Sequence, residues 1–297
     1  MSPLAGAGPT GGPADGPAGW ATTWLDLRGE ADSRSRSAEL LTTAFAAARA
    51  ARPGPAPADG VPLRVVDVGC GAGAMARWVV TRADGVPTRW VLLDPDPSLL
   101  RVGRGRLADA GATVDAVRVG TSDDLPDLLG GEHAVDLVVA SALLDVLPGP
   151  AVARLASAVV AAGVPLLCAL TVTGEVVLDP PDPVDALARD CVARTATTGG
   201  ALGPGAADTL VAAASAAGAG VRSRATPWRL DPTRDADLLR AWWDGHAAAA
   251  RHGAGPEERS TVEAWARRRD TAVAVGGLRV VVAHTDVLLL PVPWAGR

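Results

Sequence analysis

The sequence predicts an α/β fold, a doubly wound and mostly parallel seven-stranded sheet with an N-terminal helical extension. Strand-like and helix-like segments alternate over most of the chain, which indicates a parallel sheet covered by helices. Of the 297 residues, 48% are hydrophobic, so a large core is available. A glycine-rich turn at residues 69–73 joins the first strand to a helix, where sheets of this kind bind ligands.

Seven segments are predicted as strands from their short apolar runs and the turn residues that bound them. In chain order they are Leu63–Val68, Arg89–Leu93, Thr113–Val119, Val135–Ala140, Val164–Val172, Val221–Trp228 and Leu278–Leu290. A long helical connection separates the last two of these strands.

The helices follow the same alternation. Those after the first strand are predicted at Ala74–Arg82, Ser98–Ala110, Ala151–Ala162, Ala206–Ala217, Asp235–His252 and Glu257–Asp270. Before the first strand, Trp20–Ala51 is predicted to be helical, with Asp32 and Ser33 as candidate caps. We therefore expect a disordered tail over residues 1–19, a helical section and linker over 20–62, and the main domain over 63–297.

The composition excludes several kinds of chemistry. All 28 basic residues are arginine, so a Walker A lysine, a Schiff base and a lysine general base are excluded, and tyrosine is absent as well. The net charge of -5 argues against a nucleic-acid partner. The four histidines are scattered without matched carboxylates, which predicts no metal site.

The location of the protein is predicted to be cytoplasmic. The three cysteines, Cys70, Cys168 and Cys191, show no CxxC spacing, and no signal peptide is recognisable. The uncharged segment Leu155–Gly174 is long enough to cross a bilayer, but Gly163 and Pro165 interrupt it. We interpret it as a helix followed by a core strand, and we expect no membrane partner.

Asp67 distinguishes between the ligands that the glycine turn could hold. The turn fits the G-x-G-x-x-G/A dinucleotide fingerprint, but a carboxylate two residues before Gly69 would repel a pyrophosphate and attract an ammonium group. No Gly-Lys follows, which excludes a P-loop.

The segment "DVGCGAG" resembles the first motif of the class I S-adenosylmethionine-dependent methyltransferases, an acidic residue followed by G-x-G-x-G. The resemblance implies a Rossmann-like methyltransferase fold with S-adenosylmethionine as the cofactor. Gly69, Gly71 and Gly73 would surround its methionine part, and Asp67 would hold its amino group. Asp94, at the end of the second strand, would bind the ribose hydroxyls, with a helix cap or turn as the alternative.

The third motif of the family is only partly present. "GTSDDLP" carries Thr121 where the family has the aspartate that contacts the adenine amine. The resemblance leaves Ser122, through its backbone N–H, as the cofactor contact here. Asp123 either compensates for the missing aspartate or belongs with Asp124 to a solvated turn.

Two residues are candidates for the catalytic base. Asp145 ends the fourth strand where the family often has histidine, and its alternative role is a helix N-cap or a surface carboxylate. His246 lies within the predicted insertion near 231–276, the region that in this family lines the acceptor pocket. Trp243 is the candidate substrate contact beside it, and Trp242 lies on the same helix. The alternative is an aromatic core with a surface histidine.

The N-terminal section supplies further substrate-binding candidates. In related enzymes such a segment covers the cofactor or the acceptor, so Trp24, Arg28 and Arg36 would contact the ligand. An arginine here suits an acidic acceptor or the cofactor carboxylate. The alternative is a solvated amphipathic helix with its own ion pairs.

The leading functional hypothesis is methyl transfer from S-adenosylmethionine to oxygen or nitrogen of a small-molecule acceptor. A non-catalytic, regulatory protein that binds S-adenosylmethionine is the first alternative. An NAD(P)-binding oxidoreductase is the second, which Asp67 disfavours. The oligomeric state stays open, with a homodimer among the options.

Overall fold

The fold is described for residues 16–52, 60–131, 134–196 and 200–291 of a computed structural model. The strands are β1 (Leu63–Val68), β2 (Thr88–Asp94), β3 (Thr113–Val119), β4 (Leu137–Ser141), β5 (Leu166–Asp179), β6 (Gly220–Ala225), β7 (Trp228–Leu230) and β8 (Arg279–Leu290). The α-helices are α1 (Gly16–Ser35), α2 (Ala38–Ala51), α3 (Ala74–Arg82), α4 (Pro97–Asp109), α5 (Leu125–Leu129), α6 (Gly149–Ala162), α7 (Asp185–Ala196), α8 (Ala206–Ala216), α9 (Ala236–Gly253) and α10 (Arg259–Ala274). Short 3-10 turns are η1 (Ser122–Asp124), η2 (Leu144–Val146) and η4 (Gly203–Gly205).

The sheet confirms the predicted α/β fold. Its order is β3-β2-β1-β4-β5-β8-β6, and β7 pairs with the far part of β8. Strands β1 to β5 pair in parallel, whereas β8 runs antiparallel to β5, β6 and β7. The described residues thus form eight strands, one more than the seven predicted.

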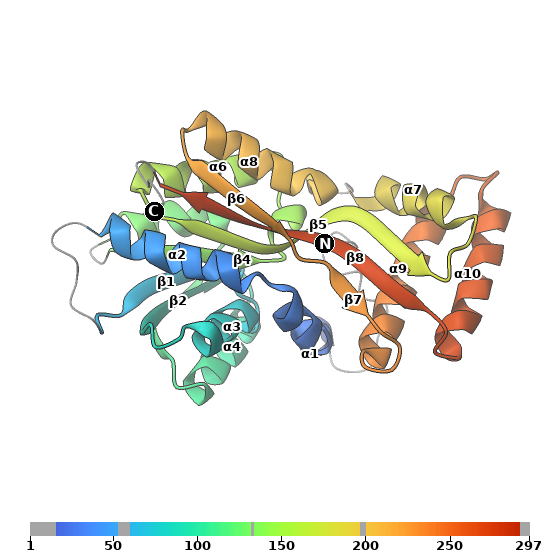
Figure 1. Cartoon of the computed structure of the whole chain (residues 1–297), viewed down its shortest axis with the longest axis horizontal. Coiled ribbons are helices and arrows are strands. Elements are labelled where there is room, and N and C mark those ends of the chain that lie inside the picture. Colours follow the sequence, from blue (N-terminus) through green and yellow to red (C-terminus); the bar gives the residue numbers. More distant parts are fainter. Residues whose placement is uncertain (1–15, 53–59, 132–133, 197–199, 292–297) are drawn as a thin grey trace.

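The two faces of the sheet are buried by different helices, as a doubly wound fold requires. Val65 belongs to a core that contains the buried side chains of α2, α3 and α4, whereas its neighbour Val66 belongs to a core with those of α6 and α8. Figure 1 shows α6 and α8 above the sheet and α3 and α4 below it. The alternation along β1 is what allows a continuous apolar strand to have two packed faces.

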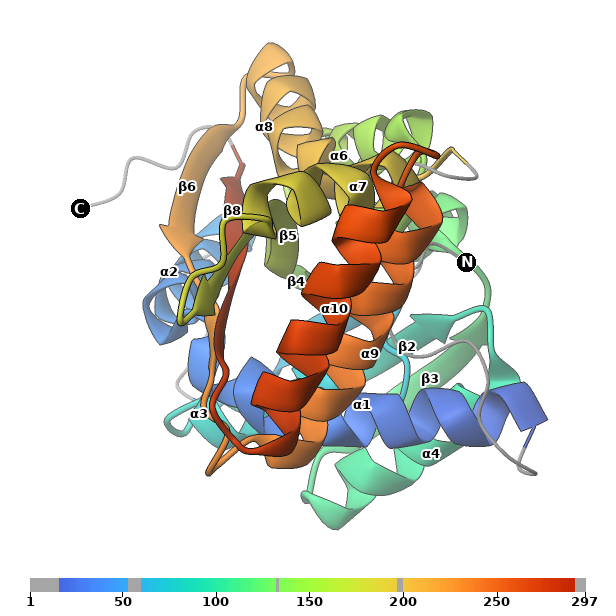
Figure 2. The ribbon, with the colours of Figure 1, turned by 90° about the vertical axis from the view of Figure 1, so that its right-hand side faces the viewer.

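A second structural region extends from the parallel part of the sheet. β5 and β8 continue beyond it as long antiparallel partners, and α7, α9 and α10 pack together at their far end (Figure 1). The view in Figure 2 has α9 and α10 in front of these strands. The predicted insertion over residues 231–276 corresponds to α9, α10 and their connections.

Several predicted boundaries need correction. The strand predicted at Val221–Trp228 is split into β6 and β7 around Pro227, which has no N–H for the ladder. β5 continues to Asp179, seven residues past the predicted end, because β8 still pairs with it there. Helix α7 was not predicted.

The predicted N-terminal helical section consists of two helices. α1 ends at Ser35, and Ser37 caps α2 by accepting the backbone N–H of Leu40. Asp32 and Ser33, the candidate caps, lie inside α1 instead. α1 begins at Gly16, within the segment expected to be a disordered tail, of which residues 1–15 lie outside the described residues.

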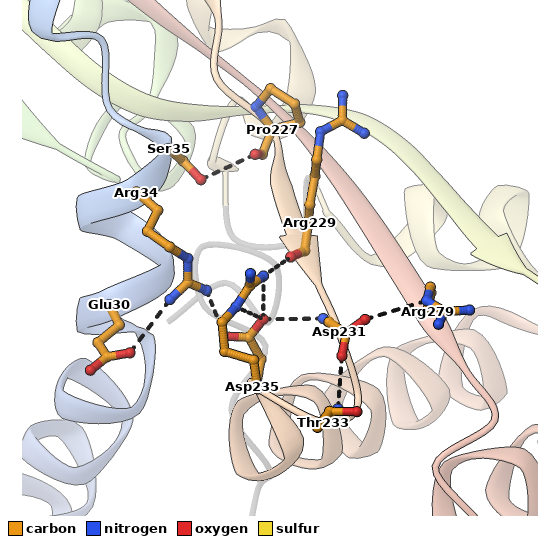
Figure 3. A network of polar contacts seen from close by, with 10 residues as sticks. Glu30, Arg34, Ser35, Pro227, Arg229, Asp231, Thr233, Asp235 and Arg279 are labelled. Atoms are coloured by element: carbon orange, nitrogen blue, oxygen red, sulfur yellow. Dashed lines mark hydrogen bonds and ion pairs between the residues drawn. The ribbon is translucent and has the colours of Figure 1, made fainter.

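A polar network attaches α1 to the strand and loop that precede α9 (Figure 3). Arg34 donates to Asp235, and the Ser35 hydroxyl donates to the carbonyl of Pro227 at 3.1 Å. Asp231 in turn accepts from Arg279 and from the backbone of Thr233. These contacts fix the C-terminal end of α1 against the second structural region.

The uncharged segment Leu155–Gly174 folds as interpreted from the sequence. α6 ends at Ala162, Gly163 follows with a φ of 67°, and β5 begins at Leu166. Across the ranges that the structure describes, no helix has both the length and the apolar character needed to span a bilayer.

Candidate active site

The glycine turn between β1 and α3 depends on the absence of side chains. Gly69, Gly71 and Gly73 have φ angles of 64°, 50° and 79°, a region that residues with a Cβ rarely adopt. A Cβ on Gly69 would lie 2.7 Å from Leu143, and one on Gly73 would lie 2.9 Å from Leu107. The three glycines therefore allow a tight turn at the carboxyl end of β1.

Asp94 stabilises this turn from the end of β2. One of its carboxylate oxygens accepts the N–H of Gly71 at 2.8 Å, and the other accepts the N–H of Asp96 at 2.9 Å. The helix-cap role that was the alternative for Asp94 is taken by Asp96, which accepts from the first turn of α4. Each oxygen of Asp94 keeps a free lone pair that could accept a further hydrogen bond, and the ribose contact stays a prediction.

Asp67 is a buried carboxyl group with one unused oxygen. It is fully buried at the end of β1, and its Oδ2 accepts the N–H of Ala76 at 3.2 Å. Its Oδ1 has no hydrogen-bond partner among the described residues. Burial raises the pKa of Asp67 to about 7, so the free protein holds its charge at a cost.

Arg36 faces the same cavity with a complementary charge. This guanidinium is buried where α1 ends, and its Nη2 donates to Ser141 at 3.0 Å and to Asp32 at 3.4 Å. Its Nε is a buried donor that meets no acceptor within the described part of the chain. Arg36, Asp67 and the glycine turn all line a cavity of about 590 Å³, which we call the turn cavity.

The loop after β3 forms a capped turn. Asp124 accepts the backbone N–H of Thr121 at 2.7 Å, and Asp123 forms an exposed ion pair with Arg154 of α6. Asp123 and Asp124 thus belong to an exposed turn, which was the alternative interpretation of this segment. Ser122 is nearly buried in η1, and its contact with a ligand stays a prediction.

A second cavity adjoins the turn cavity and brings together several predicted residues. It has a volume of about 810 Å³, and we call it the aromatic cavity. Four of the predicted substrate or catalytic residues line it, namely Trp24, Arg28, Asp145 and His246. Trp24, Arg28 and Ala142 line both cavities, so the two spaces share a wall formed by α1 and the end of β4.

Asp145 and His246 are both buried, which excludes the surface roles that were their alternatives. Asp145 lies in η2 with 2% of its surface exposed, and its Oδ1 is unpartnered within the described residues. Burial raises the pKa of Asp145 to about 6. His246 is 4% exposed, and burial lowers its pKa to about 4, so its ring is neutral at pH 7.

The expectation for Trp243 needs correction, because its neighbour Trp242 lines the aromatic cavity instead. Trp243 does not line the cavity; its Nε1 donates to Asp270 at 2.7 Å and its ring packs on Trp265. Trp242 stacks on His246 with ring centroids 4.6 Å apart, as expected for residues one helical turn apart.

Trp228 and His284 were not predicted as site residues from the sequence. Both line the aromatic cavity, and their ring centroids lie 5.0 Å apart. Only the pairing of β7 with β8 brings the two rings together, and β7 itself was not predicted as a separate strand.

Arg28, one of the residues of the shared wall, forms a buried ion pair with Asp32. The Arg28 Nε donates to Asp32 at 2.9 Å, and the indole N–H of Trp228 donates to the same carboxylate at 3.0 Å. The ion pair expected in a solvated helix is therefore present, but it is buried and holds α1 on β7.

His133 lies outside the described residues. Within the described ranges, no three histidine, cysteine or acidic side chains form a group that could hold a metal.

Acids that end β1 and β2 around a glycine turn define the class of α/β proteins that bind a nucleoside-containing ligand at the carboxyl edge of the sheet. Residues 65–163, about a third of the chain, match the family model described as a methyltransferase domain. The matched segment includes the glycine turn and Asp94. It confirms the resemblance that the motif Asp67–Gly73 indicated.

Solved structures with a similar fold have low sequence identity to this chain. A SAM-dependent methyltransferase from Geobacter sulfurreducens, solved with S-adenosyl-L-homocysteine, is 17% identical with a TM-score of 0.41 and covers 89% of this chain and 98% of its own. The cyclopropane synthase MmaA2 from Mycobacterium tuberculosis is 14% identical with a TM-score of 0.42, covering 77% and 78%. YcgJ from Bacillus subtilis is 15% identical with a TM-score of 0.45, covering 77% and 92%. No curated protein matches the sequence.

Proposed function

We propose that this protein is a methyltransferase that uses S-adenosylmethionine and methylates oxygen or nitrogen of a small molecule. The observation that carries the proposal is a pair of unpartnered buried atoms, Asp67 Oδ1 and Arg36 Nε, on two residues that line the turn cavity. The methyltransferase-domain match over residues 65–163 supports the same function.

The turn cavity suits the amino-acid end of S-adenosylmethionine because it offers one acceptor and one donor of opposite charge. An ammonium group would complete the hydrogen bonding of Asp67, and a carboxylate would complete that of Arg36. The buried Asp67 carboxylate also disfavours a pyrophosphate on the glycine turn, which argues against the NAD(P)-binding alternative. Asp94 and Ser122 are the proposed contacts for the ribose and the adenine.

The aromatic cavity is the proposed site of the acceptor. When bound, S-adenosylmethionine supplies an activated methyl group whose transfer to the acceptor leaves S-adenosylhomocysteine and sets free the acceptor's proton. The wall shared by the two cavities would hold the acceptor next to the cofactor, which favours an enzyme over a non-catalytic binder. Asp145, with a pKa of about 6, is suited to take up the proton near neutral pH.

Calorimetry with a pair of ligands tests the cofactor site. S-adenosylhomocysteine carries the amino-acid group, whereas 5′-methylthioadenosine lacks it and keeps the nucleoside. We expect Asp67→Asn and Arg36→Gln each to weaken S-adenosylhomocysteine by about ten- to a hundredfold, the effect of losing a charged hydrogen bond. Binding of methylthioadenosine should stay within about twofold of the wild type.

Matched controls come from the same helix and from the protein surface. Arg34→Gln alters an arginine of α1 that faces Asp235 and not the cavity, and Asp190→Asn alters an exposed acid. Neither should change the affinity for either ligand. Equal losses for both ligands in the Asp67 and Arg36 variants would contradict the proposed contacts, and binding of NAD in place of S-adenosylhomocysteine would contradict the function.

A further inference from the structure

The aromatic cavity has a lining that selects for a particular chemistry. Trp24, Trp228 and Trp242 contribute indole rings, and the remaining apolar lining comes from side chains of β5, α7 and β8 together with Ala142 and Pro204. All three tryptophans are less than a tenth exposed. This lining favours a flat, largely apolar ligand with at least one ring.

The charged residues that line this cavity are Arg28 and Asp145, which are buried, and Glu175 and Arg189, which are exposed. Burial lowers the pKa values of His246 and His284 to about 4, so both imidazoles are neutral at pH 7. Arg28 is paired with Asp32, and its guanidinium lies over the face of Trp228, 5.2 Å from the ring centroid. One face of Trp242 is stacked against His246, with ring centroids 4.6 Å apart.

Two buried polar atoms of the lining lack partners within the described residues. They are Oδ1 of Asp145, an acceptor, and Nε1 of Trp24, a donor. Buried polar atoms are almost always hydrogen-bonded, so each of these marks a position where a ligand atom is expected. A ligand that satisfies both must supply a donor and an acceptor.

The backbone around the cavity is also strained. Of the three non-glycine residues with positive φ in the described part of the chain, two line this cavity: Ala142 at 51° and Leu170 at 57°. Such conformations cost free energy and are found at ligand sites. Ala142 leads into the turn that carries Asp145, and the strain therefore belongs to the element that positions the carboxyl group.

We propose that the methyl acceptor is an uncharged hydroxylated aromatic compound, whose hydroxyl donates to Asp145 and whose hydroxyl or neighbouring oxygen accepts from Trp24. This inference rests on the proposed function and narrows the transfer to oxygen. An ammonium ligand offers donors alone, so it would leave Trp24 Nε1 unpartnered. A carboxylate ligand offers acceptors alone, so it would leave Asp145 Oδ1 unpartnered and would be repelled by that carboxylate.

Four probes with one ring system test this choice by calorimetry on the full chain in the presence of saturating S-adenosylhomocysteine. They are naphthol, its methyl ether, naphthoate and naphthylmethylammonium, all substituted at the same ring position. We expect naphthol to bind about ten- to a hundredfold more tightly than the other three, because it alone is neutral and can both donate and accept. Tighter binding of the ammonium or the carboxylate probe would overturn the inference.

Asp145→Leu removes the carboxyl group and keeps a side chain of similar size. It should weaken naphthol by about tenfold or more and leave the methyl ether within about twofold, since the ether donates no hydrogen bond. Asp190→Leu is the matched control, an exposed acid on α7, and should change neither. Trp24→Phe should weaken naphthol and its ether alike. An equal loss of naphthol affinity in Asp145→Leu and Asp190→Leu would overturn the assignment of Asp145.

S-adenosylhomocysteine binding separates failure of this inference from failure of the proposed function. If S-adenosylhomocysteine binds and none of the aromatic probes does, the substrate class is wrong and the function stands. If S-adenosylhomocysteine itself does not bind, both are wrong. Binding of S-adenosylhomocysteine to Asp145→Leu at wild-type affinity shows in addition that the variant is folded.

Discussion

At the scale of single residues, two buried carboxyl groups have incomplete hydrogen bonding. Asp67 and Asp145 each keep one oxygen without a partner among the residues that the structure describes, and burial raises the pKa of each. An unpaired buried charge is costly, so neither carboxyl group stabilises the free folded protein when it is ionised. Their unpartnered oxygens are explained if a ligand supplies the missing hydrogen-bond donors, an ammonium at Asp67 and a hydroxyl at Asp145.

The stability of the free protein should therefore depend on the charge of Asp67. Its pKa is about 7 when folded, against an ordinary value of 3.8, so between these values the folded protein keeps a proton that the unfolded chain has released. The contribution of Asp67 to the free energy of unfolding is thus fully present below about pH 4 and is lost as pH rises through about 7. At most it amounts to about 4 kcal/mol.

Urea denaturation of the wild type and of Asp67→Asn, repeated from pH 4 to pH 8, measures this contribution. As pH rises, the free energy of unfolding of the variant should increase relative to that of the wild type, because asparagine does not ionise. The control Asp26→Asn alters an exposed acid of α1 and should follow the wild type at every pH. Parallel curves for Asp67→Asn and the wild type would contradict the raised pKa.

Residue positions were predictable from the sequence where a motif fixes them along the chain. Asp67, the three glycines and Asp94 follow from their spacing at two strand ends, and the structure has them around one turn. Trp243 was not predictable in this way, since neighbouring residues on a helix differ by about 100° in direction. Nothing in "AWWDGH" distinguishes the tryptophan that faces the cavity from the one that packs on Trp265.

At the scale of elements, one buried carboxylate joins three segments that are distant in the sequence. Asp286 of β8 accepts the N–H of Ser37 before α2, the N–H of Leu170 in β5 and the hydroxyl of Thr226 between β6 and β7, each at 2.8 Å. It is 1% exposed. These bonds hold the junction of α1 and α2, which carries Arg36, against the sheet.

Asp286→Ala should destabilise the protein by about 3 kcal/mol or more, because three buried donors lose their acceptor. Asp286→Asn keeps one acceptor oxygen and should lose less. Chemical denaturation at pH 7 measures both, and Asp190→Ala, an exposed acid, should stay within about 0.5 kcal/mol of the wild type. A loss below about 1 kcal/mol in Asp286→Ala would show that this junction is held by other contacts.

The elements of the parallel sheet were predictable, and those of the second structural region were less so. β1, β3 and α3 have the bounds expected from apolar runs and the glycine turn. The extension of β5 was not predicted, since Thr173, Gly174 and Glu175 interrupt its apolar pattern. Its register with β8 shifts between Val172 and Val176, so strand pairing with a distant segment decides its length. α7 was likewise hidden behind the proline-rich segment that precedes it.

At the scale of the whole molecule, α1 connects the two proposed sites. It contributes Trp24 and Arg28 to both cavities, and its C-terminal end is fixed to the second structural region by the network of Figure 3. The parallel sheet supplies the turn cavity, whereas β5, α7, α9 and β8 supply most of the aromatic cavity. The methyltransferase-domain match ends at residue 163, before β5, and the proposed acceptor site therefore depends on the part of the chain beyond that match.

The most direct test is a crystal structure of the full chain with S-adenosylhomocysteine. We expect the ligand's ammonium group within hydrogen-bond distance of Asp67 Oδ1, its carboxylate at Arg36, its ribose at Asp94, and its sulfur directed toward the wall of Trp24 and Ala142. A ligand bound elsewhere, or one whose carboxylate lies on the glycine turn away from Arg36, would contradict the account.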